Sequence, residues 1–399
     1  MTLATPSVKS ASTGAAPAKS LDAVRRIAKE IARLHAADVD HKARFPVETL
    51  QALKEQKLMS ALVPADLGGA ALGFGEVATM CEMLATGCAS AAMVFAMHQI
   101  QVACIARHGL SSPGLAKYLR DLVQHQYLIA SVTSEVGVGG EMRTSVAAVS
   151  REGERYAVNK DATTISYCEH ADDLLLTARR APEASPNDQV LVLLKKGDYR
   201  AEKTGNWDTM GMRGTCSPAF KVSAQGPADH VLPEPFADIA SHTMVPVSHV
   251  LWASVWLGIA SSAVSMARAF VRQQARAKPG TVPPTAVRLA EVSSLLQTIR
   301  TNVHDVVSEA EDLMTHGGTD ALSSISFALK MNNLKVAASQ LVVQVVHQTL
   351  LICGIMGYKN DSPFALGRHL RDAHSAALMV GNDRILATNA SLLLVLKED

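Results

Sequence analysis

The sequence predicts a mainly helical protein with a β-domain inserted between two helical regions. Three observations lead to this prediction. Apolar residues recur at steps of three and four from residue 20 to about residue 126, and again after Pro246, a spacing that places them on one face of a helix. Short β-prone runs separated by turn residues occupy the segment between. The 399 residues are 48% hydrophobic but only 4% aromatic, a balance that suits long packed helices.

The chain is expected to divide into four parts. Its first residues are rich in Ser, Ala, Thr, Pro and Lys and lack an apolar run, which is typical of a disordered tail rather than a secretory signal. The predicted parts are a disordered tail at 1–19, an N-terminal helical domain at 20–126, a central small β-barrel at 127–238 and a C-terminal four-helix bundle at 239–399.

The N-terminal domain is predicted to consist of amphipathic helices. Ser20 is a suitable N-cap for the first, whose apolar residues recur every three or four positions. Those residues are Leu21, Val24, Ile27, Ile31 and Leu34. Further helices are expected at 46–56, 75–85 and 89–107.

The β-domain is predicted to begin with a strand at 129–133. A hairpin at 146–159 follows it and turns at Glu152 and Gly153. Further strands are expected at 174–178, 190–194 and 219–222.

The C-terminal region is predicted to contain four long helices, at about 247–276, 285–315, 319–353 and 364–396. The third carries only three charged residues, Asp320, Lys330 and Lys335. A helix so apolar must be covered on several sides, which indicates a bundle core or a subunit interface. The least polar stretch, 245–271, contains a histidine, an arginine and several serines, so we interpret it as a buried core helix and expect no membrane span.

Charge and cysteine spacing argue against several classes of function. A net charge of +1 gives no electrostatic reason to expect a nucleic acid or an anionic membrane as partner. The six cysteines are scattered, without CxxC or short Cys/His spacing. We therefore expect no metal site and no disulfide framework, and a reducing, cytoplasmic location.

Five short motifs then connect the chain to a known family. They are Pro64-Ala-Asp-Leu-Gly-Gly69, Ser134-Glu-Val-Gly-Val-Gly-Gly-Glu141, Met210-Gly-Met-Arg-Gly-Thr215, Gly354-Ile-Met-Gly-Tyr358 and Leu370-Arg-Asp-Ala373. In this order, and on these elements, they resemble the acyl-CoA dehydrogenase family of flavoproteins over nearly the whole chain after residue 20. The resemblance implies FAD bound between the β-domain and the bundle, usually in a homotetramer. It also implies a small-molecule substrate such as a CoA thioester.

The resemblance places the flavin edge on the β-domain. The implied flavin-contacting residues are Ser131, Thr133, Ser134 and Ser166, which offer hydroxyls and amides. Thr164 occupies the position of the family's tryptophan that shields the isoalloxazine, so the flavin face is open to oxygen or a different substrate unless Tyr167 covers it. Gly140 replaces the family's serine in the glycine run, which removes one hydroxyl contact but lets the backbone approach the substrate closely.

The pyrophosphate of FAD would be held by another set of residues. Arg276 is the candidate cation after the first bundle helix, although a solvated basic face explains it equally well. On a partner subunit, Gly354 and Gly357 would present backbone amides to the ADP part. Asn382, which follows the position of the usual base, is a further implied cofactor contact.

The position of the catalytic base is where the chain departs from the family. Counting from Arg371-Asp372 places Val380 where most relatives have a glutamate, next to the substrate, and valine cannot accept a proton. A minority of relatives carry the glutamate on the first bundle helix, where this chain has Ser248. His249 and His98 are the remaining candidates for an acid or base, unless each is hydrogen-bonded inside the helical core.

Three functions remain open. The first is an FAD-dependent dehydrogenase acting on the CH-CH group of an acyl-CoA, with electrons passed to an electron-transfer flavoprotein. The second is a flavin-dependent monooxygenase or oxidase on the same fold, for which FMN would suffice and which takes reduced flavin from a flavin reductase. The third is a catalytically impaired relative that acts as a partner subunit.

Overall fold

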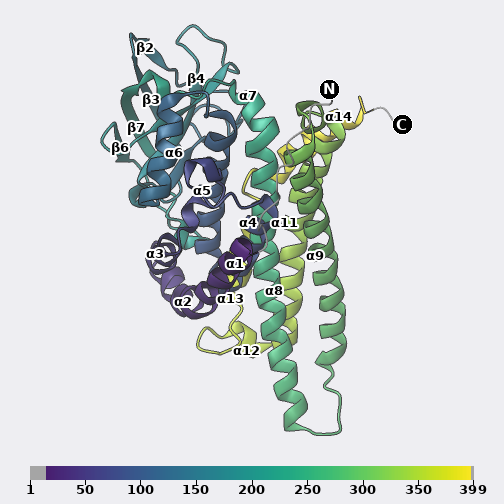
Figure 1. The fold of residues 1–399 in the computed structure, drawn as a ribbon. Coiled ribbons are helices and arrows are strands. Elements are labelled where there is room, and N and C mark those ends of the chain that lie inside the picture. Colours follow the sequence, from purple (N-terminus) through teal and green to yellow (C-terminus); the bar gives the residue numbers. More distant parts are fainter. Residues whose placement is uncertain (1–14, 397–399) are drawn as a thin grey trace, which may run out of the picture.

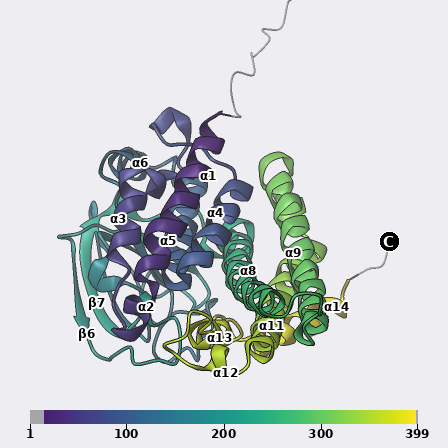
Figure 2. The same cartoon turned by 90° about the horizontal axis from the view of Figure 1, so that it is seen from below.

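The computed structural model describes residues 15–396 and confirms a mainly helical protein with a β-domain between two helical regions. The N-terminal helices and the sheets lie on one side of α8 (Val245–Ala277), and the long helices extend below them (Figure 1). Seen from below, α8 lies between the N-terminal helices and the pair α9 (Thr285–His316) and α11 (Ile325–Cys353) (Figure 2).

The N-terminal domain contains the helices that the periodicity predicts, together with a π-helical turn and a further helix. Its elements are α1 (Ala15–Ile27), the π-helical turn Ala28–Ala32, α2 (Arg33–His41), α3 (Val47–Glu55), α4 (Phe74–Gly87), α5 (Ala89–His108) and α6 (Pro113–His125). Residues 15–19, which we assigned to a disordered tail, are helical, and the rest of that tail lies outside the described residues. The helix not predicted, α6, has a regular start: Ser112 accepts the backbone N–H of Leu115, and Pro113 occupies the first turn.

The β-domain consists of two sheets rather than one continuous barrel sheet. In the first, β1 (Ile129–Val132) runs parallel to β4 (Asp173–Arg179), which pairs with the antiparallel β5 (Gln189–Leu194). The second has the order β2 (Ser150–Glu152), β3 (Arg155–Ala162), β7 (Phe220–Pro227) and β6 (Tyr199–Lys203). Burial alternates along β7, so this sheet has one face on the core.

The C-terminal region contains three long helices and a broken fourth one. A short α7 (Phe236–Ile239) and a π-helical turn lead directly into α8, and α10 (Thr319–Leu322) precedes α11. A short α12 (Ile355–Tyr358) follows α11, and the predicted fourth helix is interrupted: α13 (Gly367–His374) is followed by a turn, and only then by α14 (Asn382–Leu393). The interruption falls at Val380, whose φ of 50° is incompatible with a continuing right-handed helix.

Close packing joins the two helical regions. A side chain at Gly258 of α8 would come within 2.3 Å of the Glu82 carbonyl oxygen, so the glycine lets α4 pack directly against α8.

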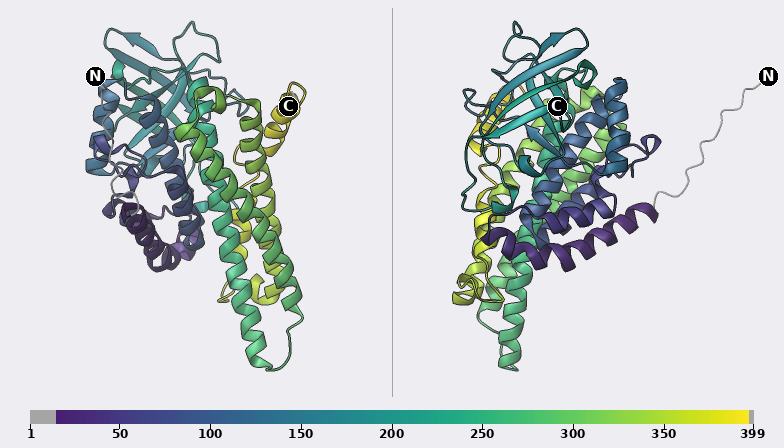
Figure 3. Two further views of the ribbon diagram at one scale, coloured as in Figure 1. Left: turned by 45° about the vertical axis from the view of Figure 1, so that its right-hand side comes forward. Right: turned by 90° about the vertical axis from the view of Figure 1, so that its left-hand side faces the viewer.

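Three helical stretches, α5, α7–α8 and α11, are long and apolar enough to cross a membrane by length and composition alone. Within the molecule 94%, 78% and 50% of their most apolar windows are buried, so α11 is the least covered of the three. Figure 3 shows the C-terminal helix α14, in yellow, at the same end of the molecule as the sheets.

Candidate functional site

The predicted flavin-edge residues meet at the end of β1. Ser131, Thr133 and Ser134 are half-buried, and the Ser134 hydroxyl donates to the Thr164 carbonyl oxygen at 2.7 Å while it accepts the Thr164 N–H at 3.0 Å. The Ser217 hydroxyl donates to that of Ser166 at 2.9 Å. The structure therefore brings segments 131–134 and 164–166 together, as a shared flavin edge requires.

Thr164 and Tyr167, the two residues considered for the flavin face, differ in exposure. Thr164 is exposed, whereas Tyr167 is fully buried and donates its hydroxyl to the Ile129 carbonyl oxygen at 3.0 Å. The suggestion that Tyr167 covers the flavin face is therefore wrong, because this side chain is fixed inside the protein beside Phe45.

A buried ion pair shapes the glycine run that follows β1. The Glu135 carboxylate accepts the N–H groups of Val146 and Ala147 at 3.1 and 2.6 Å, and its oxygen lies 3.5 Å from the Lys160 ammonium. Burial lowers the pKa of Lys160 to about 8, against the raising effect of Glu135. Glu135 is thus fully engaged in holding the loop, and it is not available as a base.

The glycine run reaches the C-terminal helix. Gly137, Gly139 and Gly140 all have positive φ, which a side chain would disfavour. Arg384 of α14 donates to the carbonyl oxygens of Gly139, at 2.6 Å, and Gly140. These bonds place the predicted substrate-contacting residue Gly140 beside the turn that carries Val380.

The turn from residue 375 to 381 is anchored on the bundle core. Lys335 of α11 is fully buried and donates to the carbonyl oxygen of Val380 and to Oδ1 of Asn382, both at 2.7 Å. The Asn382 amide donates to the Ser339 hydroxyl at 3.0 Å. Asn382, predicted to contact the cofactor, therefore has its side chain turned into the bundle, while the Val380 residue is 43% exposed.

Arg371 and Asp372, on which the register of Val380 depends, have structural roles. The Arg371 guanidinium pairs with the buried Asp40 carboxylate of α2. Asp372 accepts the Met212 N–H at 2.7 Å, and burial raises its pKa to about 6. A side chain at Gly211 would approach the Arg371 carbonyl oxygen to 2.2 Å. The motif therefore joins α13 to α2 and to the loop around residue 211.

His98 does not fit the acid–base role predicted for it. Its Nε2–H donates to the Met59 carbonyl oxygen at 2.8 Å, and its Nδ1 accepts the Ile129 N–H at 3.0 Å. Burial lowers its pKa to about 4. Both ring nitrogens are committed to the backbone, so His98 joins α5 to the start of β1 instead of moving protons.

His249 keeps one ring nitrogen free of such bonds. Its Nδ1–H donates to the Met331 carbonyl oxygen at 3.1 Å, which leaves Nε2 unprotonated in the neutral ring. Burial, and then the charge of Lys335, lowers its pKa to about 4. Nε2 has no hydrogen-bond partner within residues 15–396, and protein atoms do not enclose it completely. The neighbouring Ser248 donates its hydroxyl to the Met244 carbonyl oxygen one turn earlier, so it is not poised as a nucleophile or base.

The predicted pyrophosphate contacts lie away from the flavin edge of the same chain. Arg276 is in the last turn of α8, and Figure 1 shows this end of α8 projecting at the opposite end from the sheets. Gly354 follows the last residue of α11 with a φ of 56°, and a side chain added there would meet nothing within 4 Å. Gly357, in α12, packs on Leu350 of α11. The structure thus does not bring Arg276, Gly354 and Gly357 to Ser131 within one chain.

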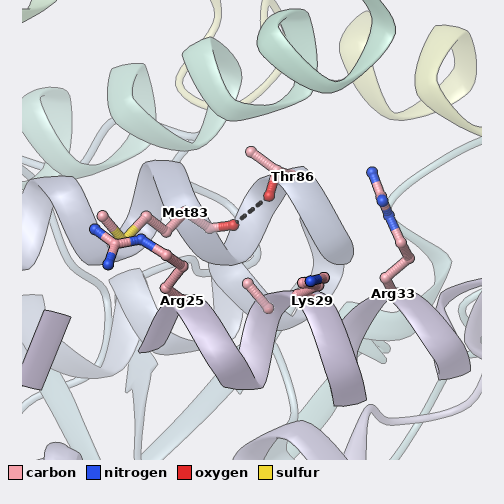
Figure 4. Close-up of a pocket in the computed structure, with 6 residues that line it drawn as sticks. Arg25, Lys29, Arg33, Met83 and Thr86 are labelled. Atoms are coloured by element: carbon pink, nitrogen blue, oxygen red, sulfur yellow. Dashed lines mark hydrogen bonds between the residues drawn. The ribbon is translucent and has the colours of Figure 1, made fainter. Parts of the chain in front are cut away.

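One cavity lies away from this site. A cavity of about 190 Å³ lies between the π-helical turn and α4, and Figure 4 shows Arg25, Lys29 and Arg33 beside Met83 and Thr86 there. No cluster of three or more histidine, cysteine or acidic side chains suited to a metal ion is found in the part of the chain that the structure describes.

Comparisons with known proteins agree with this architecture. The family model for the acyl-CoA dehydrogenase N-terminal domain matches residues 18–126, and that for the C-terminal domain matches residues 250–384. The chain belongs to the acyl-CoA dehydrogenase family. The resemblance predicted from the five motifs is therefore confirmed.

The chain is similar to proteins whose names state different activities. The chain is 24% identical over 381 residues to cyclohex-1-ene-1-carbonyl-CoA dehydrogenase of Geobacter metallireducens, covering 94% of this chain and 97% of the relative. It is 25% identical to the amino sugar nitrososynthase DnmZ of Streptomyces peucetius, covering 86% and 84%. Among solved structures, FMN-bound TdsC from Paenibacillus sp. A11-2, a dibenzothiophene monooxygenase, superposes with a TM-score of 0.83 at 18% identity, covering 94% and 97%.

Two residues of the site escaped the sequence analysis. Lys335 was visible only as one of three charges on an apolar helix, and that isolation was the signal that its charge needs a specific partner. Arg384 carried no signal, because its partners are backbone carbonyl groups some 244 positions away.

Proposed function

We propose that the protein is a flavin-dependent oxidoreductase of the monooxygenase or oxidase type, rather than a dehydrogenase of acyl-CoA thioesters. The observation that carries the proposal is the absence of a usable carboxylate at either family position. Val380 occupies one, and Ser248, bonded to the Met244 carbonyl oxygen, occupies the other. Removal of the α-proton of a thioester needs a base, because carbon acids of this kind do not ionise unaided near neutral pH.

The flavin would lie against the edge formed by Ser131, Thr133 and Ser134, with its outer face open at Thr164. A bound flavin supplies two-electron transfer and, when reduced, reacts with oxygen. His249 supports the same reaction class, because its neutral ring offers the unprotonated Nε2 as a hydrogen-bond acceptor or base. FMN bound to TdsC, and the nitrososynthase activity named for DnmZ, are consistent precedents on this fold.

The cofactor and the assembly are linked. FAD would need an ADP site as well as the ring site, and Arg276 at the far end of α8 and Gly354 and Gly357 around α12 lie away from the sheets. We propose that FAD is held across two chains of a homotetramer, with the second chain supplying these residues. The half-covered apolar window of α11 supports such an assembly. FMN needs the ring site and a site for one phosphate but no ADP site, and a protein that binds FMN as a monomer would favour the simpler arrangement.

A dehydrogenase remains the second candidate because of Asp383. This carboxylate is exposed in the first turn of α14, three residues after Val380. In that case an electron-transfer flavoprotein would accept the electrons, whereas the oxygenase would take them from a flavin reductase.

Stopped-flow reoxidation separates the two reactions. The flavin-loaded protein is reduced by dithionite under anaerobic conditions and mixed with air-saturated buffer. We expect reoxidation within seconds in the wild type and in Asp383→Asn. Reoxidation that takes many minutes, in a protein that an acyl-CoA reduces and that Asp383→Asn inactivates, would establish the dehydrogenase instead.

A further inference from the structure

Lys335 is a buried cation without a buried anion. Its side chain has no exposed surface, and no carboxylate pairs with it within the described residues 15–396. Its ammonium nitrogen lies 5.8 Å from the centre of the Trp256 ring, which gives weak cation–π stabilisation. Burial of an unpaired charge is costly, so its position calls for a role other than core packing.

The partners of Lys335 show what that role is. Two of its three N–H groups end on the Val380 carbonyl oxygen and on Asn382, both at 2.7 Å. Val380 is a β-branched residue with a φ of 50°, a conformation that such residues rarely adopt. The charge-assisted bond holds its carbonyl group in place and therefore maintains the left-handed turn against its own preference.

The left-handed turn at Val380 also sets the position of α14. That helix begins at Asn382, and Arg384 in its first turn reaches the carbonyl oxygens of Gly139 and Gly140. A continuous series of contacts thus runs from the bundle core to the glycine run that follows β1.

We propose that Lys335 is a positioning residue for the flavin site: it locks the left-handed turn at Val380 and so places Arg384 to hold the glycine run over the flavin edge. The effect on the flavin rests on the function proposed above, whereas the effect on the turn does not.

A double-mutant cycle tests the link between Lys335 and Val380. Lys335→Met keeps most of the length of the side chain and removes its donors, and Val380→Gly makes a left-handed turn acceptable without help. In the flavin-loaded protein, Lys335→Met should weaken flavin binding about tenfold and shift the flavin absorption band. In the Val380→Gly background the same change should weaken flavin binding only about threefold or less, because residues in contact are typically coupled to this extent. Lys330→Met, at a partly exposed ion pair on the same helix, is the matched control and should leave binding and spectrum unchanged.

Equal losses in both backgrounds would overturn the proposal, because they would show that Lys335 acts only as core packing. If Lys335→Met does not fold, Arg384→Ala tests the other end of the series. It should weaken flavin binding and shift the spectrum in the same direction as Lys335→Met. Arg143→Ala, at an exposed arginine near the glycine run, is the control and should change neither. Unchanged flavin binding and an unchanged spectrum in Arg384→Ala would refute the proposal.

The proposed function can fail separately from this inference. If the wild type binds no flavin, the cycle is read from the thermal unfolding of the protein alone. Non-additive shifts of the unfolding temperature would then support the lock on the turn, and additive shifts would refute it.

Discussion

The loop that carries the glycine run should depend on the charge of Glu135. Glu135→Gln preserves the shape of the side chain but leaves the Lys160 ammonium, which has no exposed surface, without its only carboxylate partner at 3.5 Å within the described part of the chain. It also places an amide N–H group among the donors of Ser145, Val146 and Ala147. Breaking a buried ion pair in this way costs about 3–5 kcal/mol of unfolding free energy.

Urea unfolding followed by circular dichroism measures the loss. Glu141→Gln, on the same loop but partly exposed, is the control and should stay within about 0.5 kcal/mol of the wild type. A loss below about 1 kcal/mol in Glu135→Gln would refute the argument, since it would mean that the charge of Glu135 is dispensable.

The pH dependence of that loss gives a second check. Burial lowers the pKa of Lys160 to about 8, and removal of Glu135 takes away a raising effect, so the lysine in the variant releases its proton at lower pH. A folded-state pKa below that of the unfolded chain means that the unfolded state binds more protons, so stability rises with pH across this window. The deficit of Glu135→Gln should therefore shrink between about pH 7 and pH 9.

Three further outcomes follow from the site. Burial raises the pKa of Asp372 to about 6, so between about pH 4 and 6 the folded protein binds a proton that the unfolded chain does not. The wild type should therefore lose stability as pH rises across that range, and the unfolding temperature should change less with pH in Asp372→Asn. Burial lowers the pKa of His249 and the charge of Lys335 lowers it further, so Lys335→Met should raise that pKa in a histidine NMR titration, and an unchanged value would contradict the coupling. Gly211→Ala should cost about 1–3 kcal/mol by urea unfolding because its side chain would meet a backbone oxygen at 2.2 Å, whereas Gly381→Ala, with nothing within 4 Å, should be neutral; equal effects would disprove the steric argument.

Elements with strong local patterns were predictable from the sequence. The helix expected at 89–107 is α5 (Ala89–His108), and that expected at 247–276 is α8 (Val245–Ala277), because their length and apolar period leave few alternatives. The strand β6 (Tyr199–Lys203) was missed because it is short and lies at a sheet edge, and its two apolar side chains, Tyr199 and Ala201, are only partly buried.

The candidate site was predictable only where a family motif marks it. Ser134 and Thr164 were assigned from motifs, and the structure joins them. The break at Val380 was not foreseeable, because valine is a poor residue for positive φ and the turn is maintained by Lys335 from another helix. His98 was mistaken for an acid–base candidate because its two backbone partners, Met59 and Ile129, are distant in sequence.

Anaerobic titration with acyl-CoA thioesters of different chain lengths tests the proposed reaction class most directly. The flavin-loaded protein is mixed with each thioester, and the flavin absorbance is followed. With Val380 in place of the usual base, we expect no bleaching by any of them, and gain of bleaching in Val380→Glu if the pocket still accepts thioesters. Bleaching of the wild-type flavin by a single acyl-CoA would contradict the oxygenase assignment and establish a dehydrogenase with its base elsewhere.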